Sequence, residues 1–223
     1  MKTVVIAGAS GVVGGRALTH LLARGDVGRV VALGRRVLDV KHDKLASKIV
    51  DLQSPSSMAA EIPDDVAAAI CCLGTTMKQA GSKEAFQAVD RDAVVAFAKA
   101  ARQKGASRFV LVSSVGADSK AMSLYMKTKG ETEDAIREMG YPQVTFLRPS
   151  LLDDQGARSD HRLGEKLSLP LARAVFAVVG KTNRYAPITA DTVARAAVSA
   201  AFDDTGEPVR ALEGADLHRL GAG

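Results

Sequence analysis

Residues 3–15 have the sequence TVVIAGASGVVGG, in which a β-branched apolar run leads into three regularly spaced glycines. The apolar run is typical of a buried strand, and the residues that follow Gly11 begin a pattern with helical spacing. At such a junction Gly8 permits a tight turn, Gly11 lets the backbone approach a pyrophosphate, and Gly14 lets the helix pack closely on the strand. A plain tight turn would also use small residues, but this position in the chain favours a phosphate-binding turn at a helix N-terminus.

The same alternation of apolar runs and Ala-rich stretches continues to about residue 150. We predict strands at residues 3–7, 29–33, 48–52, 66–73, 108–113 and 143–147, and helices at residues 12–24, 82–104 and 123–139. The strands are apolar throughout rather than at every second position, which is typical of parallel strands covered on both faces. The pattern therefore predicts an α/β fold with a doubly wound parallel sheet, whose ligand lies at the carboxyl ends of the strands.

The alternating pattern weakens after residue 150. Residues 153–165 are polar and predict a loop that enters a helix, whereas residues 189–202 predict a clear helix with Thr189 as its N-cap. Residues 209–213 predict a last strand. We interpret the chain as a single domain over residues 1–223, in which residues 151–223 contribute a small substrate-covering part.

Charge and length limit the classes of partner. The net charge is +5, from 30 Lys and Arg against 25 Asp and Glu, and both signs are scattered along the 223 residues without a run of five like charges. Nucleic-acid binding usually needs a concentrated basic face, so it is disfavoured. No apolar segment reaches the length of a membrane span. We expect a small-molecule substrate, and a monomer or homodimer.

The cysteine content bears on the compartment. Cys71 and Cys72 are the two cysteines, and adjacent cysteines do not readily form an unstrained disulfide with each other. Neither they nor the scattered histidines have the spacing of metal ligands, so we expect no metal site. The apolar run at the N-terminus is too short for a secretory signal. These features together predict a reduced, cytoplasmic protein.

The second predicted strand ends in LGRR, residues 33–36. About twenty residues beyond the last glycine of the turn, an NAD-specific site would have an acidic residue on the ribose 2′-hydroxyl. Arg35 and Arg36 stand there instead, and the nearest acidic residue is Asp39. A guanidinium can form two hydrogen bonds with a 2′-phosphate and stack on adenine, so the pair predicts NADP(H) over NAD(H), with Arg35 as the main contact. The alternative is a solvated strand end.

A second group of residues follows the fifth predicted strand. Tyr125 and Lys129 are four positions apart, so on a helix they share one face. Ser113 and Ser114 end the preceding strand and can face the same cleft. A hydroxyl that holds a carbonyl oxygen, a tyrosine acid and a lysine that lowers its pKa together suit hydride transfer. The alternative is an accidental Tyr-x-x-x-Lys pattern on an amphipathic helix.

Six segments carry a resemblance to a known family: GASGVVGG, LGRR, CCLGTTMKQAGSKEAFQAVDRDAV, LVSSVGAD, LYMKTKGETE and FLRPSLL. The chain resembles the short-chain dehydrogenase/reductase superfamily, in the atypical branch that includes the mammalian HIV Tat-interacting protein and its bacterial homologues. The likeness covers residues 2–188, and CCLGTT followed by VDRD is its specific part. It implies a Rossmann-like, three-layer α/β/α fold that binds NADP(H).

The resemblance also implies a role for individual residues. The catalytic residues would be Ser114, which orients the substrate, Tyr125, the acid/base, and Lys129, which binds the nicotinamide ribose. Those that contact the cofactor would be Gly8, Ser10, Gly11, Val13 and Gly14 at the pyrophosphate, Arg35 and Arg36 at the 2′-phosphate, Asp51 and Leu52 at the adenine, Leu73, Gly74 and Thr75 at the ribose, Ser113 beside Ser114, and Pro149, Ser150 and Leu151 at the nicotinamide.

These observations favour an NADPH-dependent oxidoreductase that reduces a small carbonyl compound. An NADPH-binding regulatory or sensor protein without turnover is the alternative from a different class. A nucleotide-sugar epimerase is a third interpretation, but extended epimerases have a larger C-terminal part than residues 151–223 provide.

Overall fold

The computed structural model describes residues 1–153 and 184–222, and its centre is a seven-stranded parallel sheet. The strands stand in the order β3-β2-β1-β4-β5-β6-β9. Their bounds are β1 Lys2–Ala7, β2 Val27–Gly34, β3 Leu45–Ile49, β4 Val66–Cys71, β5 Arg108–Val112, β6 Gln143–Leu147 and β9 Val209–Leu212. A separate parallel pair consists of β7 Leu152–Asp153 and β8 Ile188–Thr189. The chain builds outward from β1 to β3 and then crosses to β4 on the other side of β1, so the predicted doubly wound sheet is confirmed.

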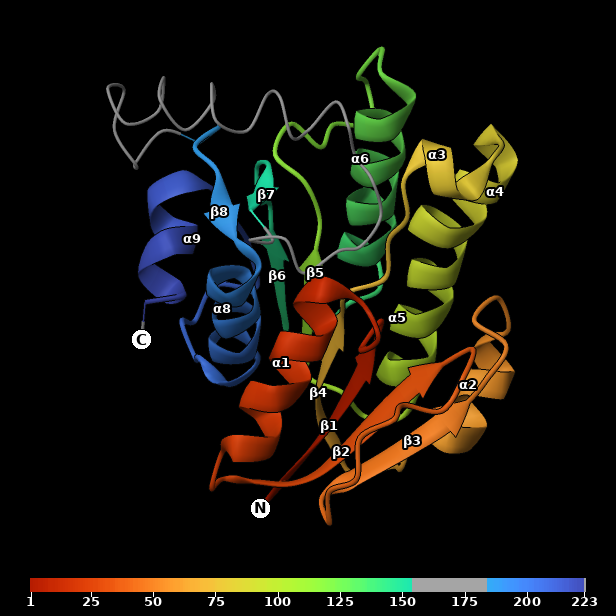
Figure 1. The fold of residues 1–223 in the computed structure, drawn as a ribbon, viewed down its shortest axis with the longest axis vertical. Coiled ribbons are helices and arrows are strands. Elements are labelled where there is room, and N and C mark those ends of the chain that lie inside the picture. The colour runs from red at the N-terminus through yellow and green to blue at the C-terminus, as the bar shows by residue number, and fades with distance from the viewer. Residues whose placement is uncertain (154–183, 223) are drawn as a thin grey trace.

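Helices cover both faces of this sheet (Figure 1). On one side lie α1 Val12–Ala23, α8 Ala190–Phe202 and α9 Gly214–Leu220, and on the other lie α2 Pro55–Glu61, α5 Val94–Gln103 and α6 Leu124–Arg137. Alternate residues of β1 supply the two cores: Val4 and Ile6 pack with α1 and α8, whereas Val5 and Ala7 pack with α2 and α5. Both faces of the strand are apolar because both are buried, as the unbroken apolar runs predicted.

Two predicted elements differ from the structure. The third strand is β3, Leu45–Ile49, and not residues 48–52, because the backbone pairs Val30–Gly34 with these earlier residues. Residues 50–52 therefore follow the strand. The helix predicted at residues 82–104 is divided into α4 Lys83–Gln87, a π-helical segment η1 Ala88–Ala93, and α5. The short helices α2, α3 (Met77–Ala80) and α9 were not predicted.

The C-terminal part agrees with the sequence where it is described. The Thr189 side chain accepts a hydrogen bond from the Thr192 amide, which confirms it as the N-cap of α8. The predicted last strand is β9. Apart from its first residue, the polar loop predicted at residues 153–165 lies outside the described residues. Within the described residues, no helix is both long enough and apolar enough to span a bilayer.

Candidate functional site

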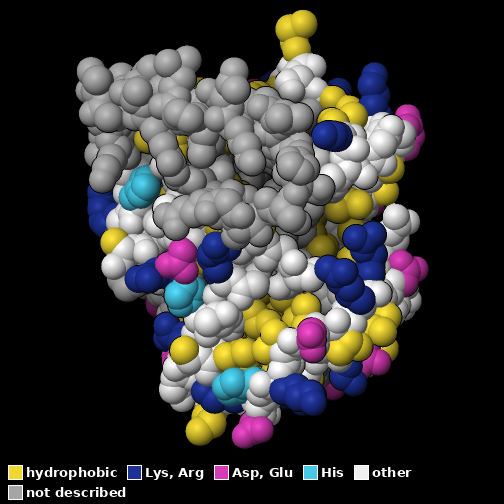
Figure 2. Space-filling model, in the orientation of Figure 1, with side chains coloured by type: hydrophobic (Ala, Val, Ile, Leu, Met, Phe, Trp, Pro, Cys, Tyr) yellow, Lys and Arg dark blue, Asp and Glu magenta, His cyan; other side chains and the backbone are white. Residues whose placement is uncertain are grey.

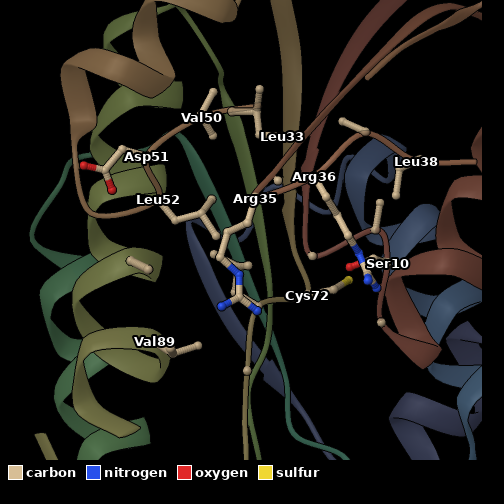
Figure 3. Close-up of a pocket in the computed structure, with 18 of the residues that line it drawn as sticks. Ser10, Leu33, Arg35, Arg36, Leu38, Val50, Asp51, Leu52, Cys72 and Val89 are labelled. Carbon is tan, nitrogen blue, oxygen red and sulfur yellow. The ribbon is translucent and has the colours of Figure 1, made fainter. Parts of the chain in front are cut away.

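A cavity of about 580 Å³ lies at the carboxyl ends of β1, β2 and β4. This is where the strand order reverses, the usual ligand site of doubly wound sheets. Its walls come from the turn after β1, the end of β2, the segment after β3, the segment after β4 and η1. The lining residues predicted from the sequence are Gly8, Ser10, Gly11, Arg35, Arg36, Asp51, Leu52, Leu73 and Gly74. The lining side chains that were not predicted include Leu38, Gln53, Cys72 and Val89. Leu38 and Val89 are apolar and lie on opposite sides of the cavity in Figure 3.

The glycine turn is possible only without side chains. Gly8 has a φ of 84°, and a Cβ there would lie 2.5 Å from the Cys72 carbonyl group. A Cβ on Gly14 would lie 2.2 Å from the Gly8 carbonyl oxygen. The turn therefore lies directly against the end of β4, and α1 begins directly against the turn.

The N-terminus of α1 remains available to a ligand. Gly11 is its N-cap, no side chain caps the helix, and its first turn contains no acidic residue. The first amide groups of a helix have no partner within the helix, and its dipole is positive at this end. Because Ser10 and Gly11 also line the cavity, these donors fit an anionic group such as a pyrophosphate.

Arg35 and Arg36 extend from the end of β2 into the cavity (Figure 3). In this view the Arg36 guanidinium points toward Ser10, and the Arg35 guanidinium lies between Leu52 and Cys72. Both arginines are exposed, and neither makes an ion pair or side-chain hydrogen bond with another residue of the described chain. Two positive charges without partners in a cavity with apolar walls fit a ligand that carries a phosphate and an aromatic base.

Asp51 lines the cavity, but its carboxylate does not face it. Its carboxyl group points away from the cavity in Figure 3 and accepts a hydrogen bond from the Gln53 amide, at 3.0 Å. The neighbouring side chains of Val50 and Leu52, together with Leu33, give this end of the cavity an apolar surface. Such a surface suits a stacked base and does not compete with the arginines for a phosphate.

A buried ion pair lies at the edge of the cavity. The Lys129 ammonium is 2.7 Å from Oδ1 of Asp90, and these side chains are 5% and 1% exposed. A Cβ on Gly74, which lines the cavity, would be 3.5 Å from the Asp90 oxygen and 3.7 Å from the Lys129 nitrogen. Burial acts to lower the pKa of Lys129, but the charge of Asp90 and the nearby Tyr125 outweigh it, so the pKa is raised. Lys129 is therefore a protonated group beside the cavity.

Tyr125 lies on the same side of α6 as Lys129. Its ring packs against Phe86 of α4 with 5.7 Å between ring centroids, and the Lys129 nitrogen is 6.0 Å from its ring centroid. The tyrosine is 37% exposed, so its phenol is open to solvent or a ligand. The sequence predicted the Tyr125 and Lys129 pair, but neither Phe86 nor Asp90.

The two serines after β5 differ in their surroundings. Ser113 is buried and donates a hydrogen bond to Oε1 of Glu133, at 2.6 Å. Glu133 is wholly buried and also accepts hydrogen bonds of 2.9 and 2.6 Å from Arg148. The Ser113 side chain therefore belongs to a buried polar network and not to the cavity wall, where it was expected. Ser114 donates a 3.3 Å hydrogen bond to the Val115 carbonyl.

Other predicted cofactor residues also lie outside the cavity wall: Val13, Gly14, Thr75, Lys129, Pro149, Ser150 and Leu151. Val13 and Gly14 are buried behind the glycine turn, and the Thr75 amide is bonded to Asp90. Ser150 donates to the Ala186 carbonyl, which ties the end of β6 to the segment before β8. The cavity wall therefore includes predicted residues after β1, β2, β3 and β4, but not those after β5 and β6.

The cysteines are not chemically activated. Cys71 is buried in β4, and burial raises the pKa of its thiol to about 12. Cys72 is half-buried and lines the cavity, and desolvation also raises the pKa of its thiol. Both remain neutral thiols near neutral pH. No group of three or more His, Cys, Asp or Glu residues that could hold a metal ion occurs in the described part of the chain.

Known proteins share this chain's sequence pattern and fold. A family pattern described as NAD(P)H-binding matches residues 8–204. The chain is 32% identical over 205 residues to "Protein fmp52, mitochondrial" of Emericella nidulans, covering 90% of this chain and 87% of that protein. It is 35% identical over 177 residues to protein HTATIP2 of Rattus norvegicus, covering 76% of this chain and 72% of that protein. The solved structure of MoeE5 in complex with UDP-glucuronic acid and NAD shares the fold, with a TM-score of 0.70 at 20% identity over 95% of this chain and 76% of that one.

These relatives contradict the cytoplasmic location expected from the sequence. Several similar proteins, that of Emericella nidulans among them, carry the name mitochondrial. The expectation was wrong because unpaired, buried cysteines distinguish a reducing compartment from an oxidising one, but not one reducing compartment from another. The argument from the N-terminus concerned secretory signals alone.

Proposed function

Because this chain belongs to the NAD(P)H-binding family, we propose that its cavity binds NADP(H) and that it reduces a small carbonyl compound by hydride transfer. The observation that carries the proposal is the pair of exposed arginines at the end of β2. Arg35 and Arg36 both line the cavity and have no ionic partner among the described residues. An unpaired guanidinium pair beside a glycine turn is best explained by an anionic ligand.

The preference for NADP(H) over NAD(H) rests on charge. NAD specificity needs an acceptor for the ribose 2′-hydroxyl, and the nearest carboxylate that lines the cavity, Asp51, points away from it. The two arginines would repel no part of NADPH and would bind its 2′-phosphate. Hydrogen bonds to charged groups contribute about 1.5–3 kcal/mol, which corresponds to a preference of roughly tenfold to a hundredfold.

The residues at the other end of the site support reduction. Bound NADPH would supply a hydride to the carbonyl carbon of the substrate. Tyr125 would donate its phenolic proton to the carbonyl oxygen, so that the products are NADP⁺ and the alcohol, and the phenolate would regain a proton from solvent. Lys129 would bind the nicotinamide ribose with its ammonium group, and Ser114 would hold the carbonyl oxygen once its hydroxyl turns from the Val115 carbonyl.

The same serines support a second candidate function, an NADPH-binding regulatory protein without turnover. The Ser113 hydroxyl is engaged by Glu133 and the Ser114 hydroxyl is bonded to backbone. A protein that uses no serine hydroxyl to hold a substrate would have the same hydrogen bonds at these two serines. In this candidate function the protein binds the nucleotide but catalyses no reaction.

A small molecule suits this surface better than a polymer or a membrane. On the face shown in Figure 2, basic and acidic side chains of the described residues are interspersed, and no broad basic area is visible. On this face the basic side chains are therefore distributed rather than concentrated. We propose that the protein acts as a monomer or homodimer on a small substrate, without a nucleic-acid or membrane partner.

Turnover separates the two candidate functions. We expect slow oxidation of NADPH, followed by absorbance at its nicotinamide band, with at least one member of a panel of aldehydes and ketones. Tyr125→Phe should lower that rate at least a hundredfold, because proton donation contributes about that much, while NADPH affinity stays within twofold. NADPH binding without turnover on any substrate would favour the regulatory protein, and an unaffected Tyr125→Phe variant would overturn the proposed role of the phenol.

A further inference from the structure

Two pairs of residues face each other where α4 and η1 meet α6. Phe86 and Asp90 are four positions apart on one side, and Tyr125 and Lys129 are four positions apart on the other. Phe86 contacts the Tyr125 ring, and Asp90 contacts the Lys129 ammonium. We propose that Asp90 is the positioning residue that fixes Lys129 at the nicotinamide end of the site, with Phe86 holding the Tyr125 ring. This inference rests on the proposed NADP(H) function.

The π-helical segment gives Asp90 its place. Ala88, Val89 and Ala93 of η1 line the cavity, while the Asp90 side chain is 1% exposed behind Gly74. Wider turns of this kind are frequent at functional sites. The segment thus forms part of the cavity wall and presents a carboxylate to α6.

Each carboxylate oxygen of Asp90 has a different partner. Oδ1 is 2.7 Å from the Lys129 ammonium, and Oδ2 accepts a 2.7 Å hydrogen bond from the Thr75 amide. The Thr132 hydroxyl of α6 donates to the Asp90 carbonyl oxygen at 3.0 Å and so fixes the backbone as well. Asp90 therefore joins the Leu73–Thr75 segment, which borders the nucleotide, to the lysine that would bind the ribose.

The charge of Asp90 is as important as its position. An ammonium group has three protons, and one bond to Asp90 leaves the others for ribose hydroxyls. The titratable groups that face Lys129 are Asp90 from η1, Tyr125 from its own helix and Cys71 from β4. Asp90 is the one carboxylate among them. Without it, burial would favour the neutral amine, which is a poorer donor to the ribose.

The test compares two ligands on the 223-residue protein. Calorimetric titrations with NADPH and with adenosine 2′,5′-bisphosphate, which lacks the nicotinamide ribose, are made on wild type, Asp90→Asn, Lys129→Met and the double variant. Asp90→Asn keeps an oxygen for the Thr75 amide but removes the charge. Asp92→Asn is the matched control, because Asp92 is two residues away, 51% exposed and paired with Arg91 at the surface.

We expect Asp90→Asn to weaken NADPH binding at least tenfold, to leave the bisphosphate within twofold, and to move the loss of NADPH affinity to lower pH. The double variant should bind NADPH no more weakly than Lys129→Met, because Asp90 acts through Lys129. Unchanged NADPH binding by Asp90→Asn, or equal weakening of both ligands, would overturn the inference alone. A wild type that binds neither ligand would overturn the proposed function together with the inference.

Discussion

The packing of α1 against the glycine turn depends on the absence of a side chain at Gly14. A methyl group there would meet the Gly8 carbonyl oxygen at 2.2 Å, and the turn on which that oxygen lies is itself pressed against Cys72. Neither neighbour is a flexible side chain that could move aside. The helix, the turn and the strand can therefore approach this closely only because Gly14 has no side chain.

Gly14→Ala should lower the free energy of unfolding by about 3 kcal/mol, because the added Cβ forces backbone apart in a packed region. It should also weaken NADPH binding, since the turn would open. Gly25→Ala is the matched control: no atom lies within 4 Å of the Cβ it would add, so its unfolding free energy should stay within about 0.5 kcal/mol of wild type. Urea denaturation measures both, and equal midpoints for the two variants would contradict the packing argument.

At the level of residues, the sequence predicted those cavity-lining positions that depend on a local pattern. Gly8, Gly11 and Arg35 stand at fixed offsets from a strand end, and all three line the cavity. It missed Asp90 and Glu133, because their partners lie on other elements and far along the chain. The sequence contains one signal that could have indicated Asp90. Asp90 stands four residues after Phe86, and the same spacing separates Tyr125 and Lys129.

Helix α6 faces the sheet with a buried polar network rather than with apolar side chains alone. Glu133 is wholly buried and accepts hydrogen bonds from Ser113, Arg148 and Arg137, and Arg148 also pairs with Glu213. The network joins β5, β6 and α6 to the segment after β9. Its carboxylate is stable there because every oxygen has a charged or hydroxyl donor.

Glu133→Gln should lower the unfolding free energy by about 3 kcal/mol, because it leaves the largely buried Arg148 guanidinium without its main counter-charge. Asp134→Asn changes the neighbouring residue in the same way, but Asp134 is 49% exposed and pairs with Arg137 at the surface. Its effect should stay below about 1 kcal/mol. Equal destabilisation of the two variants in urea denaturation would show that burial of the network contributes nothing.

At the level of elements, helices and strands with strong apolar patterns were predicted and the irregular ones were not. The strand predicted at residues 48–52 is displaced to Leu45–Ile49, because an edge strand is half-exposed and its polar residues weaken the pattern. The π-helical segment is not visible in a helical pattern, because it continues the helices on both sides and only the backbone hydrogen bonds differ. α2 was missed although Ser54 and Pro55 form an ordinary helix start.

At the level of the whole molecule, the strand order follows from the alternation of elements. Parallel strands joined by helices place all carboxyl ends at one edge, so residues far apart in sequence meet in one cavity. The sequence could therefore predict the general location of the site. It could not predict which side chains turn inward, as Ser113 and Asp51 show, because orientation depends on partners supplied by the complete fold.

The most direct test of the account is a calorimetric titration of the protein with NADPH and with NADH, repeated on Arg35→Ala. Arg219→Ala, which removes an 80% exposed arginine at the C-terminal helix, is the control for a change in net charge. We predict that wild type and the control bind NADPH roughly tenfold to a hundredfold more tightly than NADH, and that Arg35→Ala loses most of this difference with NADH binding unchanged. Equal affinity of wild type for the two nucleotides, or binding of neither, would contradict the account.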